Sequence, residues 1–183
     1  KRIYRKGDVL KKLKENIKIH LRSDVPIAFT LSGGLDSGSI VYLARKIKKK
    51  LHAFSLRSGY DDESKIINPF LKKNKIKHEY VNIKKMNNKN TLQKLIKVQD
   101  EPLVSSSQFD QYLLRKVAKN KGYKVIITGE GGDEILGGYH RQIIPYLYQE
   151  FIKKGKTINN NIKKNLLIFF GKKKNLTEYL DNF

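Results

Sequence analysis

The stretch Ser32-Gly33-Gly34-Leu35-Asp36-Ser37 organises the rest of this 183-residue sequence. The residues before it, Ile27–Leu31, are apolar or β-branched and indicate a buried strand. The residues after it place apolar side chains at helical spacing, at Ile40, Val41, Leu43, Ala44 and Ile47. The sequence therefore predicts a strand, a Gly-Gly turn and a helix, in that order.

This order of elements suits an anion such as phosphate. Backbone N–H groups of the turn and of the first helical turn converge on one point, where the helix dipole adds partial positive charge. Glycine lets the backbone approach a ligand closely, and the hydroxyls of Ser32 and Ser37 add hydrogen bonds. Asp36 would repel a bare phosphate, so its presence implies a bridging cation, for which we expect Mg²⁺. The alternative is that the glycines only make a tight turn and that Asp36 caps the helix.

Two common nucleotide-binding patterns are excluded at this stretch. No lysine follows the glycines, as the Gly-Lys-Ser/Thr pattern requires, and the three spaced glycines of the dinucleotide fingerprint are missing. The stretch resembles instead the pyrophosphate-binding loop of the N-type ATP pyrophosphatases, which cleave ATP between the α- and β-phosphates.

Composition bounds the class of protein. The length suits one well-cored domain, the hydrophobic content is 39%, and no apolar run or signal peptide indicates a membrane or export. Without cysteine there is no disulfide framework and no thiolate site, so we expect a cytoplasmic protein. The 39 basic against 17 acidic residues give a net charge of +22, but the lysines are scattered. We therefore expect a solvated surface rather than a nucleic-acid partner.

The rest of the chain predicts a repeating α/β pattern. Strands are expected at 51–56, 76–83 and Val125–Thr128, the last of them buried. Helices are expected at 8–22 with Asp8 as N-cap, around Pro69 with a kink, at 91–98, and after Ser105-Ser106-Ser107, where one serine caps the helix. This alternation predicts a parallel sheet with helices on both faces, whose ligands bind beyond the carboxyl ends of the strands.

The domain division follows from a change in character near residue 145. Residues 1–145 carry the α/β pattern. Residues 146–183 are rich in lysine, include Asn159-Asn160-Asn161 and Leu166–Phe170, and predict an incomplete helical extension with too little apolar surface for its own core.

The second informative stretch runs from Gly129 to Tyr139 and directly follows the last predicted strand. Its glycines lie beside three carboxylates, which supply hard oxygen ligands and proton acceptors. If Asp36 and Asp133 face each other across the strand ends, they can hold Mg²⁺ on a pyrophosphate.

With both stretches, the chain resembles the synthetase domain of the glutamine-dependent asparagine synthetases over roughly residues 8–142. Asp24-Val25-Pro26 and Asp100-Glu101-Pro102 match as well, in the same order. The resemblance implies an adenine nucleotide alpha-hydrolase-like fold of the N-type ATP pyrophosphatase kind. It also implies that ATP activates aspartate as β-aspartyl-AMP, releasing pyrophosphate, and that ammonia displaces AMP to give asparagine.

The resemblance also assigns roles to residues. Ser32, Gly33, Gly34, Asp36 and Ser37 would bind the pyrophosphate, and Asp36 and Asp133 would carry Mg²⁺. Leu31, Leu56 and Gly129 would frame the adenosine, Glu130 would handle protons, and Tyr139 would border the same pocket. For Glu134 a loop-stabilising role and a substrate contact both stay open.

Other readings stay open at this point. The family's glutaminase half uses an N-terminal cysteine, so we expect this chain not to hydrolyse glutamine itself and to depend on another source of ammonia, such as a glutaminase domain or subunit. The carboxylate could instead belong to a surface sugar or a β-lactam precursor, or the substrate could be a tRNA. The non-enzyme alternative is a truncated domain that binds nucleotide without turnover.

Overall fold

The computed structural model describes residues 6–57, 63–83, 89–139, 142 and 145–146. The chain divides into two compact units, residues 1–130 and residues 131–183, and each is described by itself. The predictions for Asn159–Asn161 and Leu166–Phe170 lie outside the described residues, and the boundary predicted at residue 145 stays a prediction. Among the described residues, no helix has the length and apolar character needed to span a membrane.

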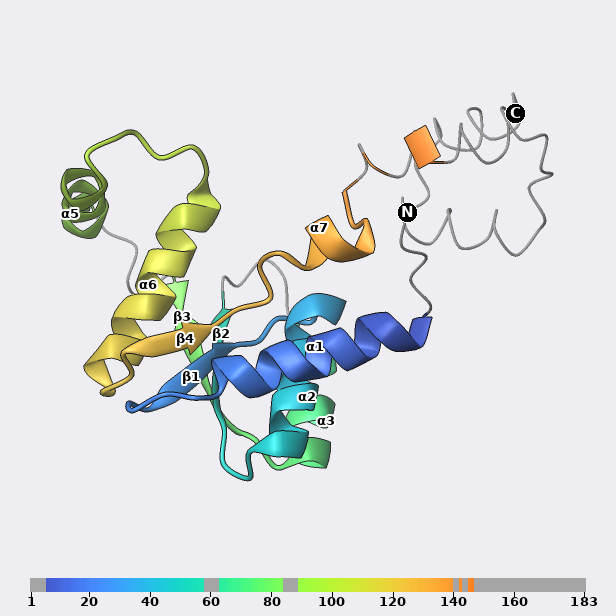
Figure 1. Ribbon diagram of the computed structural model, residues 1–183. Coiled ribbons are helices and arrows are strands. Elements are labelled where there is room, and N and C mark those ends of the chain that lie inside the picture. The colour runs from blue at the N-terminus through green and yellow to red at the C-terminus, as the bar shows by residue number, and fades with distance from the viewer. Residues whose placement is uncertain (1–5, 58–62, 84–88, 140–141, 143–144, 147–183) are drawn as a thin grey trace. The chain divides into compact units, whose positions relative to one another are not determined.

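The first unit is built on a parallel sheet with the strand order β3-β2-β1-β4 (Figure 1). The strands are β1 (Ile27–Thr30), β2 (His52–Arg57), β3 (Lys77–Asn82) and β4 (Val125–Ile127). From β1 the chain adds β2 and β3 on one side and then returns to place β4 on the other side. The strand order therefore reverses between β1 and β4, the two strands that the glycine-rich stretches follow.

Helices cover both faces of this sheet, as predicted (Figure 1). One face packs against α1 (Lys6–His20), α2 (Leu35–Ile47) and α3 (Ser64–Asn74), and the other against α6 (Ser106–Asn120). Helix α5 (Lys89–Gln99) packs on α6 through Leu95.

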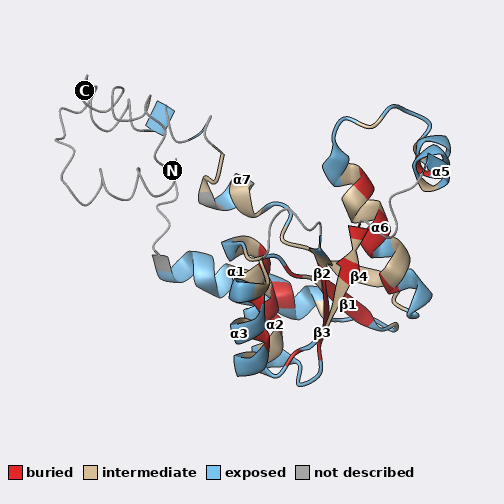
Figure 2. Ribbon diagram, turned by 180° about the vertical axis from the view of Figure 1, so that it is seen from behind, coloured by how far each residue is buried: buried red, intermediate tan, exposed pale blue. Residues whose placement is uncertain are grey.

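Buried residues gather on the central strands and the helices that cover them (Figure 2), and the strand side chains alternate between two cores. Phe29 and Ala53 belong to the core on the α1–α3 face, whereas Ala28 and Phe54 belong to the core under α6. All four are fully buried, because a parallel sheet covered on both faces hides successive residues on opposite sides. The near-continuous apolar runs of β1 and β2 are the sequence signal of that arrangement.

The predicted burial of Val125–Thr128 is wrong. Each residue of β4 is only half-buried, because the strand lies at the edge of the sheet and pairs within the described residues with β1 alone. The apolar run Val125-Ile126-Ile127 predicted a strand correctly but did not reveal that one side of it carries no neighbour.

Two helix details also differ from the predictions. Asp8 lies inside the first turn of α1 rather than at its N-cap. Ser105 is the N-cap of α6, but its hydroxyl pairs with that of Ser107 at 2.5 Å and makes no cap hydrogen bond. Helix α3 contains Pro69, and the kink predicted there stays a prediction.

Candidate functional site

The first glycine-rich loop is held by hydrogen bonds of its own. The N–H of Ser32 donates to Ser37 Oγ at 3.0 Å, and the two hydroxyl oxygens lie 2.8 Å apart. The N–H of Gly34 donates to Ser32 Oγ at 3.2 Å. Ser37 is buried and Ser32 is exposed, so the loop is anchored at one end and offers a hydroxyl to solvent at the other.

Helix α2 begins directly after this loop. Gly34 is its N-cap and supplies no side-chain cap, so the alternative reading of Asp36 as the cap is wrong. Asp36 lies half-buried in the first turn instead. The first-turn N–H groups of a helix have no partners within the helix, and the dipole places positive charge there. The turn therefore combines donors for an anion with one carboxylate that suits a cation.

Gly129 brings the second glycine-rich stretch against this loop. A Cβ built on Gly129 would lie 2.8 Å from the backbone nitrogen of Ser37 and 3.0 Å from its Cα. Real Cβ atoms do not approach backbone so closely, so only glycine fits where the chain leaves β4. Gly129, the first residue of the second stretch, thus meets Ser37, the last residue of the first, beyond the carboxyl ends of β4 and β1.

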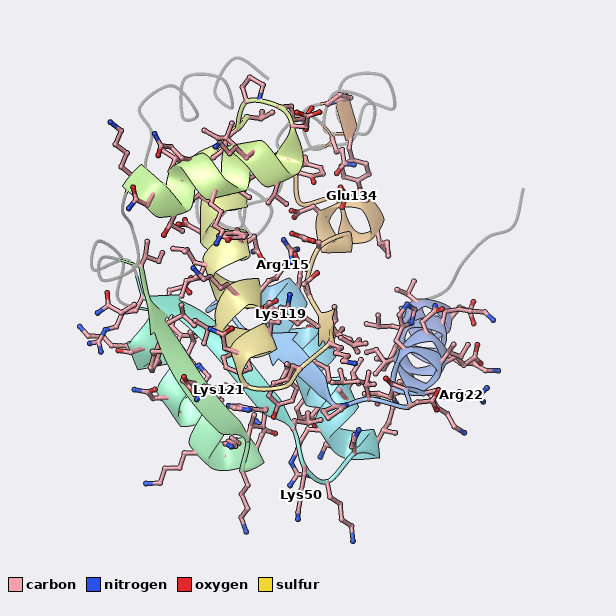
Figure 3. All side chains as sticks on the ribbon, turned by 90° about the vertical axis from the view of Figure 1, so that its left-hand side faces the viewer. Arg22, Lys50, Arg115, Lys119, Lys121 and Glu134 are labelled. Atoms are coloured by element: carbon pink, nitrogen blue, oxygen red, sulfur yellow. The ribbon has the colours of Figure 1, made fainter. Side chains whose placement is uncertain are left out.

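Glu130 follows Gly129 and is exposed. Its N–H donates to Thr128 Oγ1 at 3.3 Å, and its carboxylate lies 3.7 Å from an Arg115 guanidinium nitrogen. Arg115 projects from α6 (Figure 3). Nothing in the sequence spacing between α6 and residue 130 predicts this contact with Arg115.

The second unit contains the rest of that stretch, including α7 (Gly132–Leu136). Gly131 and Gly137, with φ of 92° and 77°, flank the helix in the left-handed conformation that favours glycine. A Cβ on Gly138 would overlap the carboxylate of Asp133. Tyr139 Oη donates to Glu134 Oε1 at 2.7 Å, which gives Glu134 a loop-stabilising contact.

The structure brings some of the predicted site residues together and does not test the predicted meeting of others. Ser32–Ser37, Gly129 and Glu130 gather at one edge of the sheet in the first unit. Asp133 and Tyr139 belong to the second unit, so their predicted meeting with Asp36 stays a prediction. Within the described ranges, no three His, Cys, Asp or Glu side chains form a group that could hold a metal ion.

Leu31 and Leu56 lie on opposite faces of the sheet. Leu31 is buried in the core of the α1–α3 face, and its N–H donates to the Phe54 carbonyl at 2.9 Å. Leu56 is half-buried against the cores beneath α6. Their predicted contact with adenosine stays a prediction.

An apolar hollow of about 340 Å³ adjoins the first loop on the α2–α3 side. Leu31, Ser32, Gly33 and Gly34 form one wall of it. The opposite wall consists of side chains from α2 and α3, namely Tyr42, Ile66, Ile67 and Phe70. The loop thus borders a surface that can contact the apolar part of a ligand.

Two histidines lie inside the sheet with hydroxyl partners. His78 Nε2 lies 2.7 Å from Ser55 Oγ, and His52 Nδ1 lies 2.8 Å from Tyr123 Oη. Burial, reinforced by the His52 charge, lowers the pKa of His78 to about 4. Burial also lowers the pKa of His52. Both rings are therefore neutral near pH 7.

Comparison with known proteins agrees with this geometry. Residues 8–182 match the model of the Asparagine synthase family. The "Putative asparagine synthetase (glutamine-hydrolyzing) 2" of Methanocaldococcus jannaschii is 35% identical over 147 residues, which are 79% of this chain and 28% of that protein. The "Asparagine synthetase (glutamine-hydrolyzing) 1" of Bacillus subtilis is 31% identical over 173 residues, covering 84% of this chain and 24% of that protein.

The same fold occurs in a solved structure of an NH3-dependent NAD synthetase from Campylobacter jejuni. It aligns with a TM-score of 0.51 and 17% identity, over 94% of this chain and 87% of that one. The fold is thus of the adenine nucleotide alpha-hydrolase-like class, as predicted. The chain belongs to the asparagine synthase family and spans about a quarter of the length of the two curated relatives above.

Proposed function

We propose that this chain catalyses ATP-dependent amide formation, converting aspartate to asparagine with release of AMP and pyrophosphate. The observation that carries the proposal is the packing of Gly129 on Ser37 where the strand order reverses. In open α/β sheets, ligands bind outside the carboxyl ends of the strands at that reversal. Membership of the asparagine synthase family supports the choice of reaction.

The reaction has two steps. A side-chain carboxylate oxygen of aspartate attacks the α-phosphorus of ATP, the bond to the bridging oxygen breaks, and pyrophosphate leaves. Ammonia then attacks the carbonyl carbon of β-aspartyl-AMP and loses a proton, and AMP departs with the electrons of the C–O bond. Adenylation is needed because it turns a poor leaving oxygen into a good one.

The first loop binds the pyrophosphate part of ATP in this proposal. Gly33 and Gly34 let the backbone approach the phosphates, and the Ser32 and Ser37 hydroxyls donate to their oxygens. Charge neutralisation and positioning supply most of the catalysis in reactions of this kind. Leu31, Leu56 and Gly129 frame the adenosine.

Glu130 accepts the proton that ammonia loses. Its exposed carboxylate lies at the end of β4, beside the Arg115 guanidinium, and a carboxylate in such a place can take up a proton from a bound nucleophile. In this proposal Tyr139 would border the site at which Glu130 acts.

Asp36 and Asp133 would hold Mg²⁺. Asp36 suits the ion because its half-buried carboxylate supplies hard oxygen atoms next to the phosphate-binding turn. When bound, the ion would neutralise negative charge on the phosphate oxygens.

The ammonia comes from a glutaminase domain or subunit. The two curated relatives carry the words glutamine-hydrolyzing in their names, and this chain has no cysteine. The cytoplasmic location expected from the sequence stays a prediction.

The test is exchange of labelled pyrophosphate into ATP by the purified chain with Mg²⁺, in the presence and absence of aspartate. We expect exchange that depends on aspartate and disappears in Asp36→Ala. Exchange with another carboxylate but not with aspartate would support adenylation but contradict aspartate as the substrate. ATP binding without exchange for any carboxylate would support a nucleotide-binding domain without turnover, and the proposal would be wrong.

A further inference from the structure

A line of hydrogen bonds crosses three strands beneath the first loop. His78 on β3 contacts Ser55 Oγ on β2 at 2.7 Å, and Ser55 Oγ contacts the carbonyl oxygen of Leu31, just after β1, at 2.5 Å. Ser55 is fully buried, and Leu31 is nearly so. A buried serine in an otherwise apolar run of β2 therefore has a specific partner at the base of the loop.

The direction of these hydrogen bonds is fixed by the single hydrogen of the serine. The Ser55 hydroxyl donates to the Leu31 carbonyl, which cannot donate, so Ser55 Oγ must accept from His78. The neutral His78 ring must then carry its proton on Nε2. A histidine in the other tautomer would place two lone pairs against each other.

The line continues into the loop through one peptide group. The Leu31 carbonyl belongs to the same peptide plane as the Ser32 N–H, and that N–H donates to Ser37 Oγ at 3.0 Å. Ser37 Oγ contacts Ser32 Oγ, which accepts the N–H of Gly34. Both ends of the Leu31–Ser32 peptide are thus held, one from the sheet and one from α2.

We propose that Ser55 and His78 are positioning residues that set the orientation of the Leu31–Ser32 peptide, and through it the shape of the anion-binding loop. The proposal deepens the proposed function, because it takes the loop to bind the pyrophosphate group. Neither side chain contacts the ligand: His78 orients Ser55, and Ser55 orients the peptide. The loss of either leaves the loop in place but with a wider range of conformations.

The experiment measures binding of inorganic pyrophosphate with Mg²⁺ to the full chain by calorimetry, together with the melting temperature. Ser55→Ala should weaken binding about 10-fold, as expected when a group that orients a binding contact is lost. Ser55→Cys fills the same site with a weaker donor and should weaken binding less. His78→Leu should weaken binding, whereas His78→Gln keeps a donor and should restore affinity to within about 2-fold of the original.

Tyr123→Phe is the matched control. It breaks the hydrogen bond of the other histidine in the sheet, His52, on the opposite face. It should lower the melting temperature about as much as Ser55→Ala while binding pyrophosphate normally. If Ser55→Ala and His78→Leu lose only stability and bind like this control, both residues are merely structural and the proposal is wrong.

A second readout separates this proposal from the proposed function. In the unliganded chain, Ser55→Ala should shift the amide resonances of Ser32 and Gly34, and Tyr123→Phe should not. If the unmodified chain does not bind pyrophosphate but these shifts occur, the proposed function fails and the positioning role holds. If the shifts do not occur, the positioning role is wrong whatever the chain binds.

Discussion

The two glycine-rich stretches look alike in sequence but use glycine differently. In the first, Gly33 and Gly34 do not adopt positive φ, and the loop is held from the sheet and from α2 by hydrogen bonds. In the second, Gly131 and Gly137 adopt the left-handed conformation and Gly138 leaves room for Asp133. In the proposed function, glycine in the first stretch gives access to a ligand, whereas in the second it shapes the stretch's own backbone.

Gly129 has neither of these two roles. It is glycine because it touches the backbone of Ser37, so it links the second stretch to the first. Glycines of one motif can thus have different structural roles. Changes at these positions should therefore have different consequences, which can be ranked by size.

The largest effect is expected from Asp36→Ala. Removal of the carboxylate proposed to hold the cation should reduce pyrophosphate exchange by about 1000-fold, the upper range for loss of one electrostatic group. The melting temperature should change little, because Asp36 is only half-buried. Asp8→Ala is the control, since Asp8 occupies the first turn of α1. Normal exchange by Asp36→Ala would show that the metal assignment is mistaken.

Gly129→Ala should come next. The added Cβ would press on the Ser37 backbone and displace the loop, which should weaken ATP binding by about 100-fold, as a 1 Å misplacement can. Overpacking should also cost about 1–3 kcal/mol of unfolding free energy. Gly7→Ala is the matched control, because an added Cβ there meets nothing within 4 Å. Calorimetry tests ATP binding and thermal melting tests stability. Equal behaviour of the two variants would contradict the contact between Gly129 and Ser37.

Gly137→Ala should have a smaller and local effect. An L-residue at φ of 77° costs about 1–2 kcal/mol, so hydrogen exchange of the α7 amides should speed up accordingly. Gly137→Asn should be milder, because asparagine tolerates this conformation better. Exchange rates unchanged in both variants would contradict the role given to this glycine.

The smallest effect is expected from pH, through His78 beneath the first loop. His78 has a pKa of about 4 in the folded chain and about 6.5 in the unfolded chain. Between these pH values the unfolded chain binds more protons than the folded chain. The contribution of His78 to stability is therefore complete above pH 6.5 and is lost as pH falls toward 4. His78→Gln should flatten the dependence of unfolding free energy on pH in this window. An unchanged slope would mean that the ring titrates normally.

Much of the fold follows from local pattern. The apolar runs around Phe29 and Phe54 and the helical spacing of Val41 and Ala44 predict β1, β2 and α2, because burial on both faces of a parallel sheet demands them. The edge position of β4 could not be predicted, since an apolar run does not say which strands lie beside it. Strand order is set by long-range packing.

The candidate site likewise has one part that the sequence predicts and one part that it does not. Ser32–Ser37 was identified from residue types and spacing because strand, turn and helix are consecutive. The contact of Glu130 with Arg115, and that of His78 with the loop through Ser55, join residues far apart in sequence and appear only in three dimensions. The polar Ser55 inside an apolar strand was the one available signal, since buried hydroxyls need partners.

The central claim is that both glycine-rich stretches form one nucleotide site. Amide resonances followed during titration of the full chain with Mg²⁺ and a non-hydrolysable ATP analogue test it most directly. The account predicts that resonances of Ser32–Ser37 and of Gly129–Tyr139 shift together with one common affinity. A response confined to one stretch, or two different affinities, would contradict it.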